Sequence, residues 1–168
     1  MIITATYYAY MILSHIAITE PPKRPVVTTI ESIKEEVSRG EVSRYERCNV
    51  TSYDLSYSSC KKKITHPDYG ITATGFDLAG KSIANGDRYI AVDPEIIPYN
   101  SMVEIFFIDK AYEKYNGTYQ AVDTGAAIKR YNRIDIFIGD FQQNKESQEV
   151  IDFGITEAYV RILPVDKP

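Results

Sequence analysis

The sequence predicts a mainly β protein built around a small closed barrel. Short runs of strand-forming residues recur after residue 48, glycines stand between them as turn signals, and only one helix is indicated in this part of the chain. A closed barrel leaves no unpaired edge strand, which favours it for several short strands in about 120 residues. The chain has 168 residues, 44% hydrophobic and 25% charged, so a disordered chain is excluded.

Six segments are expected to form the strands, because they alternate or are rich in β-branched and aromatic residues. They are residues 49–53, 89–92, 102–108, 118–122, 133–138 and 158–163. One late helix is predicted over residues 147–153, with Gly154 as a natural stop. Together these elements predict a barrel with short flanking helices.

The N-terminal part is predicted to be separate from the barrel. Residues 1–19 carry no charged side chain, which indicates an export signal or a membrane anchor and an extracytoplasmic location. The alternative is a buried strand or helix that begins the globule. Residues 20–47 are expected to form a proline-rich linker and a short helix that starts near Thr28 and stops at Gly40, and residues 48–168 form the barrel domain.

Charge and ligand counts limit the partners that we expect. Nineteen Lys and Arg against 23 Asp and Glu give a net charge of −4, which disfavours binding to nucleic acid. Two Cys and two His make a four-ligand zinc site improbable, and no metal or organic cofactor is implied. Cys48 and Cys60 allow a disulfide in an oxidising compartment but do not require one.

Three aspartates stand at or in predicted strands. Asp93 and Asp123 each end a strand, and a turn or a helix N-cap is the structural alternative for both. Asp135 lies inside a strand, on the same face as Arg133 and Phe137. A carboxyl group among apolar neighbours is costly to ionise, so its pKa should rise, as a general acid requires. The alternative is an Asp135 that pairs with Arg133 or points to solvent.

The order of these motifs resembles the three-aspartate, or 3D, domain. Residues 69–75, 90–98, 121–129 and 132–137 carry the resemblance, residues 50–62 look like the start of the domain, and the likeness covers roughly residues 48–163. This domain occurs in lytic transglycosylases and in small Gram-positive cell-wall enzymes.

The resemblance implies a six-stranded double-psi β-barrel with a groove that holds a peptidoglycan glycan strand. The activity it implies is cleavage of the bond between N-acetylmuramic acid and N-acetylglucosamine without water, leaving a 1,6-anhydro end. Asp135 matches the general acid/base, Asp93 and Asp123 match the other two aspartates, and Lys62 matches a lysine of the site. The two further aspartates would raise the pKa of Asp135, and Lys62 would oppose that rise. Glycan contacts are expected from Tyr69, Thr72, Thr124 and Lys129.

The sequence also departs from the pattern of the family. Glycine is common in the family where this chain has Lys61, Asn100, Ala126 and Arg130, and Asp123 and Asp135 are twelve positions apart rather than eleven. Residues 109–116 look like an insertion that lengthens a hairpin loop. Two further functions therefore stay open, a glycan-binding module without catalysis and a hydrolase on the same barrel.

Overall fold

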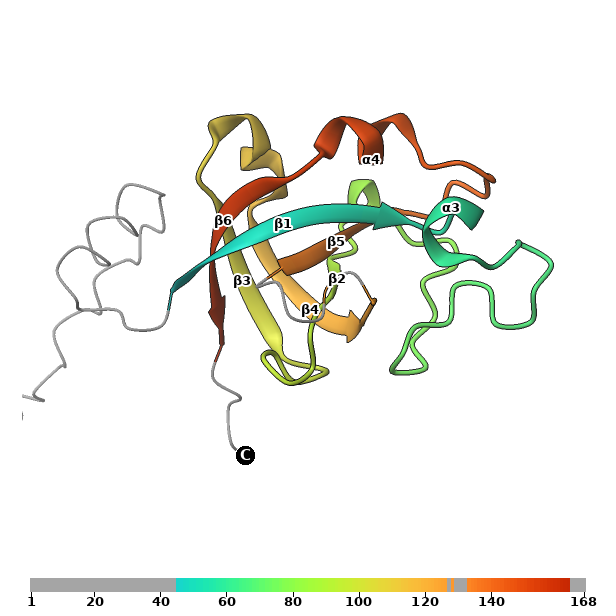
Figure 1. Cartoon of the computed structure of the whole chain (residues 1–168), viewed down its shortest axis with the longest axis horizontal. Helices are drawn as coiled ribbons and strands as arrows, with labels where there is room; N and C mark the ends of the chain where they lie inside the picture. Colours follow the sequence, from blue (N-terminus) through green and yellow to red (C-terminus); the bar gives the residue numbers. More distant parts are fainter. Residues whose placement is uncertain (1–44, 127, 129–132, 164–168) are drawn as a thin grey trace, which may run out of the picture.

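The computed structural model describes residues 45–126, 128 and 133–163, and these residues form a closed six-stranded barrel (Figure 1). The barrel order is β1-β5-β2-β4-β3-β6. The mainly β class and the closed barrel predicted from the sequence are confirmed. The strands are β1 (Glu46–Asp54), β2 (Tyr89–Ala91), β3 (Met102–Phe107), β4 (Gly117–Asp123), β5 (Arg133–Gly139) and β6 (Thr156–Ile162).

Two of the six strand pairs are parallel, β1 with β5 and β2 with β4, and the others are antiparallel. A parallel pair needs a connection that crosses from one end of the strands to the other. This mixed order agrees with the double-psi barrel that the resemblance implied. The connection from β1 to β2, residues 55–88, is the longest in the described part and carries α3 (Tyr57–Cys60) and the 3-10 helix η1 (Ile83–Asn85).

The interior of the barrel is filled by alternate residues of its strands. Ile134, Ile136 and Ile138 of β5 point inward, and each is at most 1% exposed. They pack with Val103 and Ile105 of β3 among the other core residues. Because side chains fill the barrel, a ligand must bind on its outside.

A second, smaller cluster covers the outer face of β5. Phe137 packs there with Leu55, Leu78 and Val122, and Tyr53 is among the partly buried residues against them. The cluster holds the 55–88 connection against the outside of the barrel wall. This connection and the wall form the two sides of the site described below.

Asp54 fixes the end of β1 to two neighbouring helices. Its buried carboxylate accepts hydrogen bonds from Ser56 N at 3.0 Å, Ser59 Oγ at 3.2 Å and Ser147 N at 2.7 Å. Burial acts to raise the pKa of Asp54, but these hydrogen bonds outweigh it, so the pKa lies below its usual value. The ionised carboxylate therefore joins β1, α3 and the start of α4 (Gln148–Phe153).

All six predicted strands and the late helix are present. The N-cap of α4 is Ser147, whose Oγ accepts from Val150 N, and Gly154 follows the helix at φ 60°. The predicted hairpin loop over residues 109–116 is confirmed, because this segment joins the antiparallel strands β3 and β4, and Lys110–Tyr115 within it form the 3-10 helix η2. The predicted N-terminal signal or anchor (1–19) and the helix near residues 28–40 lie outside the described residues. Within the described ranges, no helix has the length and apolar character of a membrane span.

Candidate active site

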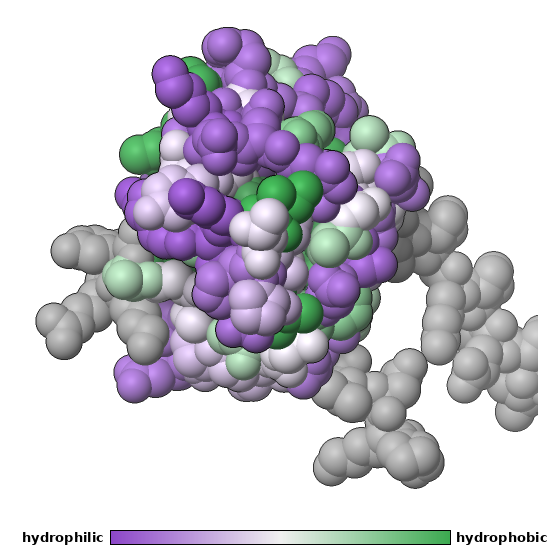
Figure 2. Space-filling view, turned by 90° about the vertical axis from the view of Figure 1, so that its right-hand side faces the viewer, coloured by the Kyte–Doolittle hydropathy of each residue, from purple (hydrophilic) through white to green (hydrophobic). Residues whose placement is uncertain are grey.

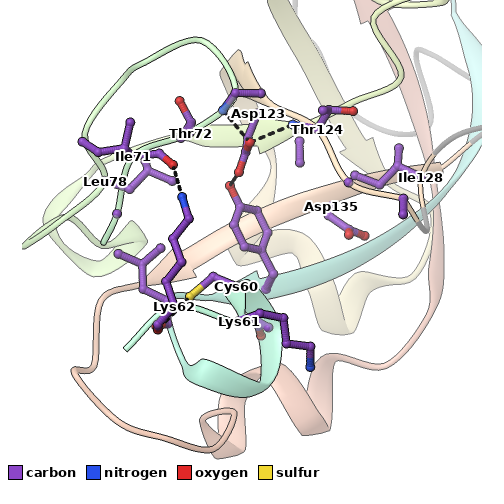
Figure 3. Close-up of a pocket in the computed structure, with 18 residues that line it drawn as sticks. Cys60, Lys61, Lys62, Ile71, Thr72, Leu78, Asp123, Thr124, Ile128 and Asp135 are labelled. Carbon is purple, nitrogen blue, oxygen red and sulfur yellow. Dashed lines mark hydrogen bonds between the residues drawn. The ribbon is translucent and has the colours of Figure 1, made fainter. Parts of the chain in front are cut away.

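A pocket of about 620 Å³ lies between the outer face of the barrel wall and the 55–88 connection (Figure 3). The wall contributes residues of β1, β2, β4 and β5, and the connection contributes α3 and the loops after it. The lining residues are Tyr53, Leu55, Ser59, Cys60, Lys61, Lys62, Gly70, Ile71, Thr72, Ala73, Leu78, Ala91, Asp123, Thr124, Gly125, Ala126, Ile128 and Asp135.

The register of the strands places two of the three predicted aspartates on this pocket. Ala91 of β2 pairs with Asp135 of β5 on one side and with Asp123 of β4 on the other. The two aspartates are therefore two strands apart, about 10 Å between their backbones. Between Ile90 and Ala91 the register with β4 shifts by one residue, and this irregularity stands directly before Asp123.

Asp135 points to the outside of the barrel because its neighbours Ile134 and Ile136 fill the core. Burial raises its pKa from 3.8 to about 6, and the charge of Arg133 acts in the opposite direction. The rise that the sequence predicted is confirmed. Its cause is burial rather than the charges of Asp93 and Asp123, and the opposing cation is Arg133 rather than Lys62.

One oxygen of this carboxyl group, Oδ1 of Asp135, is buried and has no hydrogen-bond partner in the described part of the chain. Three other buried side-chain atoms there also lack a partner: Ser52 Oγ, Thr124 Oγ1 and Arg133 Nε. Thr124 follows Asp123 directly and lines the pocket. Arg133 lies on β5 two positions before Asp135, and Ser52 pairs with the inward-facing Ile136, and neither of them is among the lining residues. Buried polar atoms are normally paired, so the unpaired atoms of Asp135 and Thr124 on the pocket mark it as suited to a polar ligand.

Asp123 is held more firmly than Asp135. Its Oδ1 accepts hydrogen bonds from the backbone N–H of Ala73 and of Thr124, both at 2.9 Å, and its Oδ2 accepts from Tyr53 OH at 3.4 Å (Figure 3). A carboxylate with these donors is fixed as an acceptor. It joins the end of β4 to the loop opposite.

Residues 69–75 form the loop that holds Asp123 and the end of β4 by hydrogen bonds. Besides the Ala73 contact, Thr74 donates from Oγ1 to the carbonyl of Val122 at 2.8 Å. Gly70 has φ 78°, and a Cβ at this position would lie 2.8 Å from the backbone nitrogen of Ala79. The glycine is needed here because the chain approaches itself too closely for a side chain.

Tyr53 is a site residue that the sequence reasoning missed. It lies on β1, two positions after Thr51, and Thr51 pairs with Asp135. Tyr53 and Asp135 therefore both face the outside of the barrel. Burial, followed by the charges of Asp123 and Asp135, raises the pKa of Tyr53 well above its usual value. Tyr53 therefore stays protonated and donates to Asp123. Period-two alternation from Val50, a core residue, was the signal that could have placed it outside the barrel.

Lys62 lines the pocket as predicted, and its Nζ donates to the carbonyl of Ile71 at 3.1 Å. The preceding Lys61 adopts φ 59° and sends its Nζ to the carbonyl of Ser58, away from the two aspartates (Figure 3). Thr72 and Thr124 also line the pocket. The structure thus brings together Lys62, Thr72, Thr124, Asp123 and Asp135.

Three predicted site residues are not brought into this pocket by the described structure. Asp93 is buried, and its Oδ1 accepts from Glu95 N at 3.0 Å within the turn after β2. Tyr69 donates from its hydroxyl to Asp140 and packs against the second cluster. Lys129 lies outside the described residues. A functional role for each of these three residues remains a prediction.

The departures from the glycine pattern of the family have different structural consequences. Lys61 and Asn100 have φ of 59° and 66°, in the left-handed region that favours glycine. Ala126 is exposed and is not among the residues with positive φ in the described part of the chain, so it does not need the freedom of glycine. Arg130 lies outside the described residues.

The two cysteines are free. Cys48 is buried in the barrel core, and Cys60 lines the pocket with its Sγ directed at the carbonyl of Ser56, 3.1 Å away. No cluster of three metal-ligating side chains occurs within the described ranges.

Fold and site together define a small β-barrel protein with an outer pocket that contains two carboxyl groups. Residues 88–163 match the sequence model of the 3D domain. The match runs from the start of β2 to the end of β6 and contains Asp93, Asp123 and Asp135. The resemblance to the 3D domain that was seen in the sequence is therefore confirmed for residues 88–163.

Several known proteins are similar to parts of this chain. The SPbeta prophage-derived uncharacterized protein YorM of Bacillus subtilis is 43% identical over 74 residues, which are 44% of this chain and 29% of YorM. The cell wall-binding protein YocH of the same organism is 35% identical over 138 residues, 82% of this chain and 39% of YocH. The chain thus matches well under half the length of either relative. Among solved structures, lytic transglycosylase MltA of E. coli has a TM-score of 0.39 at 21% identity, covering 57% of this chain and 27% of MltA.

Proposed function

We propose that the protein is a peptidoglycan lytic transglycosylase with Asp135 as its general acid/base. The protonated carboxyl group donates its proton to the oxygen between N-acetylmuramic acid and N-acetylglucosamine, and the bond from muramic acid C1 to this oxygen breaks. The C6 hydroxyl of the same muramic acid then bonds to C1, and its proton passes to the Asp135 carboxylate. The product is a 1,6-anhydro end, and Asp135 returns to its starting state.

The observation that carries this proposal is the state of Asp135. Its carboxyl group lies on a pocket, has one buried oxygen without a partner among the described residues, and has a pKa raised to about 6. A group with this pKa can both give and take a proton close to neutral pH. General acid/base catalysis of this kind typically supplies ~10²–10⁴-fold in rate.

Asp123 supports this mechanism in a different way. An ordinary glycosidase uses two carboxyl groups, the second as a nucleophile or as a base that activates water. Asp123 already accepts three hydrogen bonds, two of them from backbone N–H groups. It is therefore suited to fixing the pocket and orienting hydroxyl groups of the sugar. A transglycosylase needs only the one mobile proton, because the substrate provides its own nucleophile.

The surroundings of the pocket fit a polar polymer. The face that carries α3 and the connection after it is largely hydrophilic, with hydrophobic residues in small separate areas (Figure 2). Its neutral hydroxyls, the Lys62 amine and the two carboxyl groups suit hydroxyl and acetamido groups of a glycan strand. The cell wall-binding relative supports peptidoglycan as the partner and an extracytoplasmic place of action.

The test is mass spectrometry of the muropeptides that the full chain releases from purified peptidoglycan. Wild type should give 1,6-anhydromuramyl ends, and Asp135→Asn should lose at least 10²-fold of this activity. Asp152→Asn, the same change at an exposed position on α4, is the matched control and should retain it. Intact peptidoglycan after treatment with a wild-type protein that binds it normally would rule out the transglycosylase.

A second candidate function is glycan binding without catalysis. The name of the relative that matches 82% of this chain, a cell wall-binding protein, favours it. The same experiment separates the candidates. Binding without any product, in wild type and Asp135→Asn alike, would support the binding module, and reducing ends instead of anhydro ends would support a hydrolase.

A further inference from the structure

Arg133 is the charged residue beside Asp135 that the mechanism above does not use. It begins β5, two positions before Asp135, and the inward neighbour Ile134 places both on the outer face of the barrel. Within the described part of the chain, its buried Nε has no hydrogen-bond partner and no carboxylate forms an ion pair with it. The rest of the side chain is partly exposed.

An arginine in this state is suited to receiving an oxygen ligand. The guanidinium group presents five N–H donors, cannot lose its charge, and matches the geometry of a carboxylate. Burying Nε without a partner is costly for the protein alone, and a bound acceptor removes that cost. The cations of Arg47, Lys114 and Arg161 contrast with it, because each is paired with a glutamate.

The spacing along β5 identifies which part of the substrate would reach it. Two residues of a strand span about 7 Å. When Asp135 protonates the oxygen on C1 of a muramic acid, the lactyl group on O3 of the same ring extends a comparable distance. This group ends in a carboxylate in a glycan without peptides and in an amide carbonyl where the peptide stem is attached. N-Acetylglucosamine has only a hydroxyl group at this position.

We propose that Arg133 binds the lactyl oxygen of the muramic acid whose C1 is attacked, and so selects muramic acid over N-acetylglucosamine at Asp135. This inference rests on the proposed function. Arg133 lies beside the lining of the pocket, at the start of β5, and acts there as a specificity-determining residue whose guanidinium donates to an anionic or carbonyl acceptor.

Arg133 has a second effect, because its charge acts on the pKa of Asp135. Tyr53 from β1, Asp123 from β4 and Lys62 from the connection line the pocket with Asp135. Arg133 is the residue whose charge holds the pKa of Asp135 below the value that burial alone would set. Neutralising Arg133 should therefore raise that pKa, whereas loss of a lactyl contact alone would leave it unchanged.

Binding to three saccharides tests the proposal. They are an N-acetylglucosamine oligomer, a peptide-free muramyl glycan of equal length, and the same glycan with peptide stems. In the Asp135→Asn background, which removes turnover, Arg133→Gln should weaken binding of the peptide-free muramyl glycan by about 10–100-fold. Binding of the N-acetylglucosamine oligomer should change less than about 2-fold, and Arg133→Lys should restore part of the loss.

Arg47, at the start of β1, forms an exposed ion pair with Glu157. Arg47→Gln is the matched control and should leave all three affinities unchanged. Equal loss for every saccharide would overturn the proposal, because it would show a structural role. No loss for the muramyl glycans, or no binding of any saccharide by the Asp135→Asn parent, would overturn it as well. If the parent prefers muramyl glycans through Arg133 but wild type forms no anhydro product, the proposed reaction fails and the binding inference stands.

The pH dependence of activity tests the effect of Arg133 on the pKa of Asp135 independently of saccharide binding. With Asp135 unsubstituted, Arg133→Gln should move the alkaline limb of the pH profile to higher pH, since the catalytic acid would stay protonated longer. Arg133→Lys should leave the limb near its wild-type position. A limb that stays in place in Arg133→Gln would remove the electrostatic part of this inference.

Discussion

In the proposed mechanism, the pKa of Asp135 sets the pH range in which the protein is active. Its carboxyl group must be protonated to act as an acid, and its pKa is about 6. We therefore expect kcat/KM for release of anhydro-muropeptides to fall as the pH rises through about 6, tenfold per pH unit well above it. Initial rates between pH 4 and 8 measure this. A rate that stays constant from pH 5 to 8 would contradict Asp135 as the acid.

Lys61 carries a conformational cost that can be measured. It ends α3 at φ 59°, where a residue other than glycine is strained by about 1–2 kcal/mol. Lys61→Gly should relieve this strain, and part of the gain is offset by the greater freedom of glycine in the unfolded chain. We expect the free energy of unfolding to rise by about 0.5–1 kcal/mol in urea titrations. Lys63→Gly, on the exposed loop without positive φ, should show no such gain.

Single residues of the site differ in how far the sequence could predict them. Asp135 was predictable because a carboxyl group inside an apolar alternating strand is unusual wherever the strand lies. Tyr53 was missed because its role depends on Asp123, 70 positions away. Asp93 was placed in the site by its order in the motif, but its side chain accepts from Glu95 in its own turn and does not line the pocket.

At the scale of elements, strands were predictable and connections were not. Period-two alternation is a local property, and it located all six strands. The helices α3, η1 and η2 are short, and short helices depend on contacts made after folding rather than on propensity. The cover that residues 55–88 form over β5 depends on the second cluster, whose members come from distant segments.

The attachment of α3 and α4 to β1 depends on one carboxylate, so Asp54→Asn tests it. The asparagine side chain has one acceptor oxygen where the aspartate has two. Its NH₂ group would therefore face N–H or O–H donors that now donate to the Asp54 carboxylate. We expect a loss of about 2–3 kcal/mol in unfolding free energy at pH 7.

The pH dependence of the Asp54→Asn effect follows from the sign of the shift. The folded-state pKa of Asp54 is below 3.8, so its stabilisation is present above the unfolded pKa and is lost as the pH falls through the folded pKa. The gap between wild type and Asp54→Asn should therefore be constant above pH 5 and narrow below about pH 4. A gap that does not change down to pH 2 would show that packing, not charge, is responsible.

For the whole molecule, the carboxyl group of Asp135, which we propose as the catalytic acid, lowers the stability of the folded state when it is ionised. The pKa of Asp135 rises from 3.8 to about 6 on folding, so its ionised form destabilises the folded state above pH 6 and has no such effect below about pH 4. Asp135→Asn should raise the unfolding free energy at pH 7 by an amount on the order of 1–3 kcal/mol. Thermal unfolding at pH 4 and pH 7 measures the difference. Equal stability of the two proteins at both pH values would contradict a raised pKa.

The same pairing of Ala91 with both aspartates decides what an inserted residue can do. Asp123 and Asp135 are twelve positions apart where the family has eleven, yet both are anchored to one alanine on the strand between them. Their separation is then a property of hydrogen-bonded sheet spacing and not of the length of chain that joins them. A change in the number of residues between the two aspartates therefore need not change the distance between their carboxyl groups.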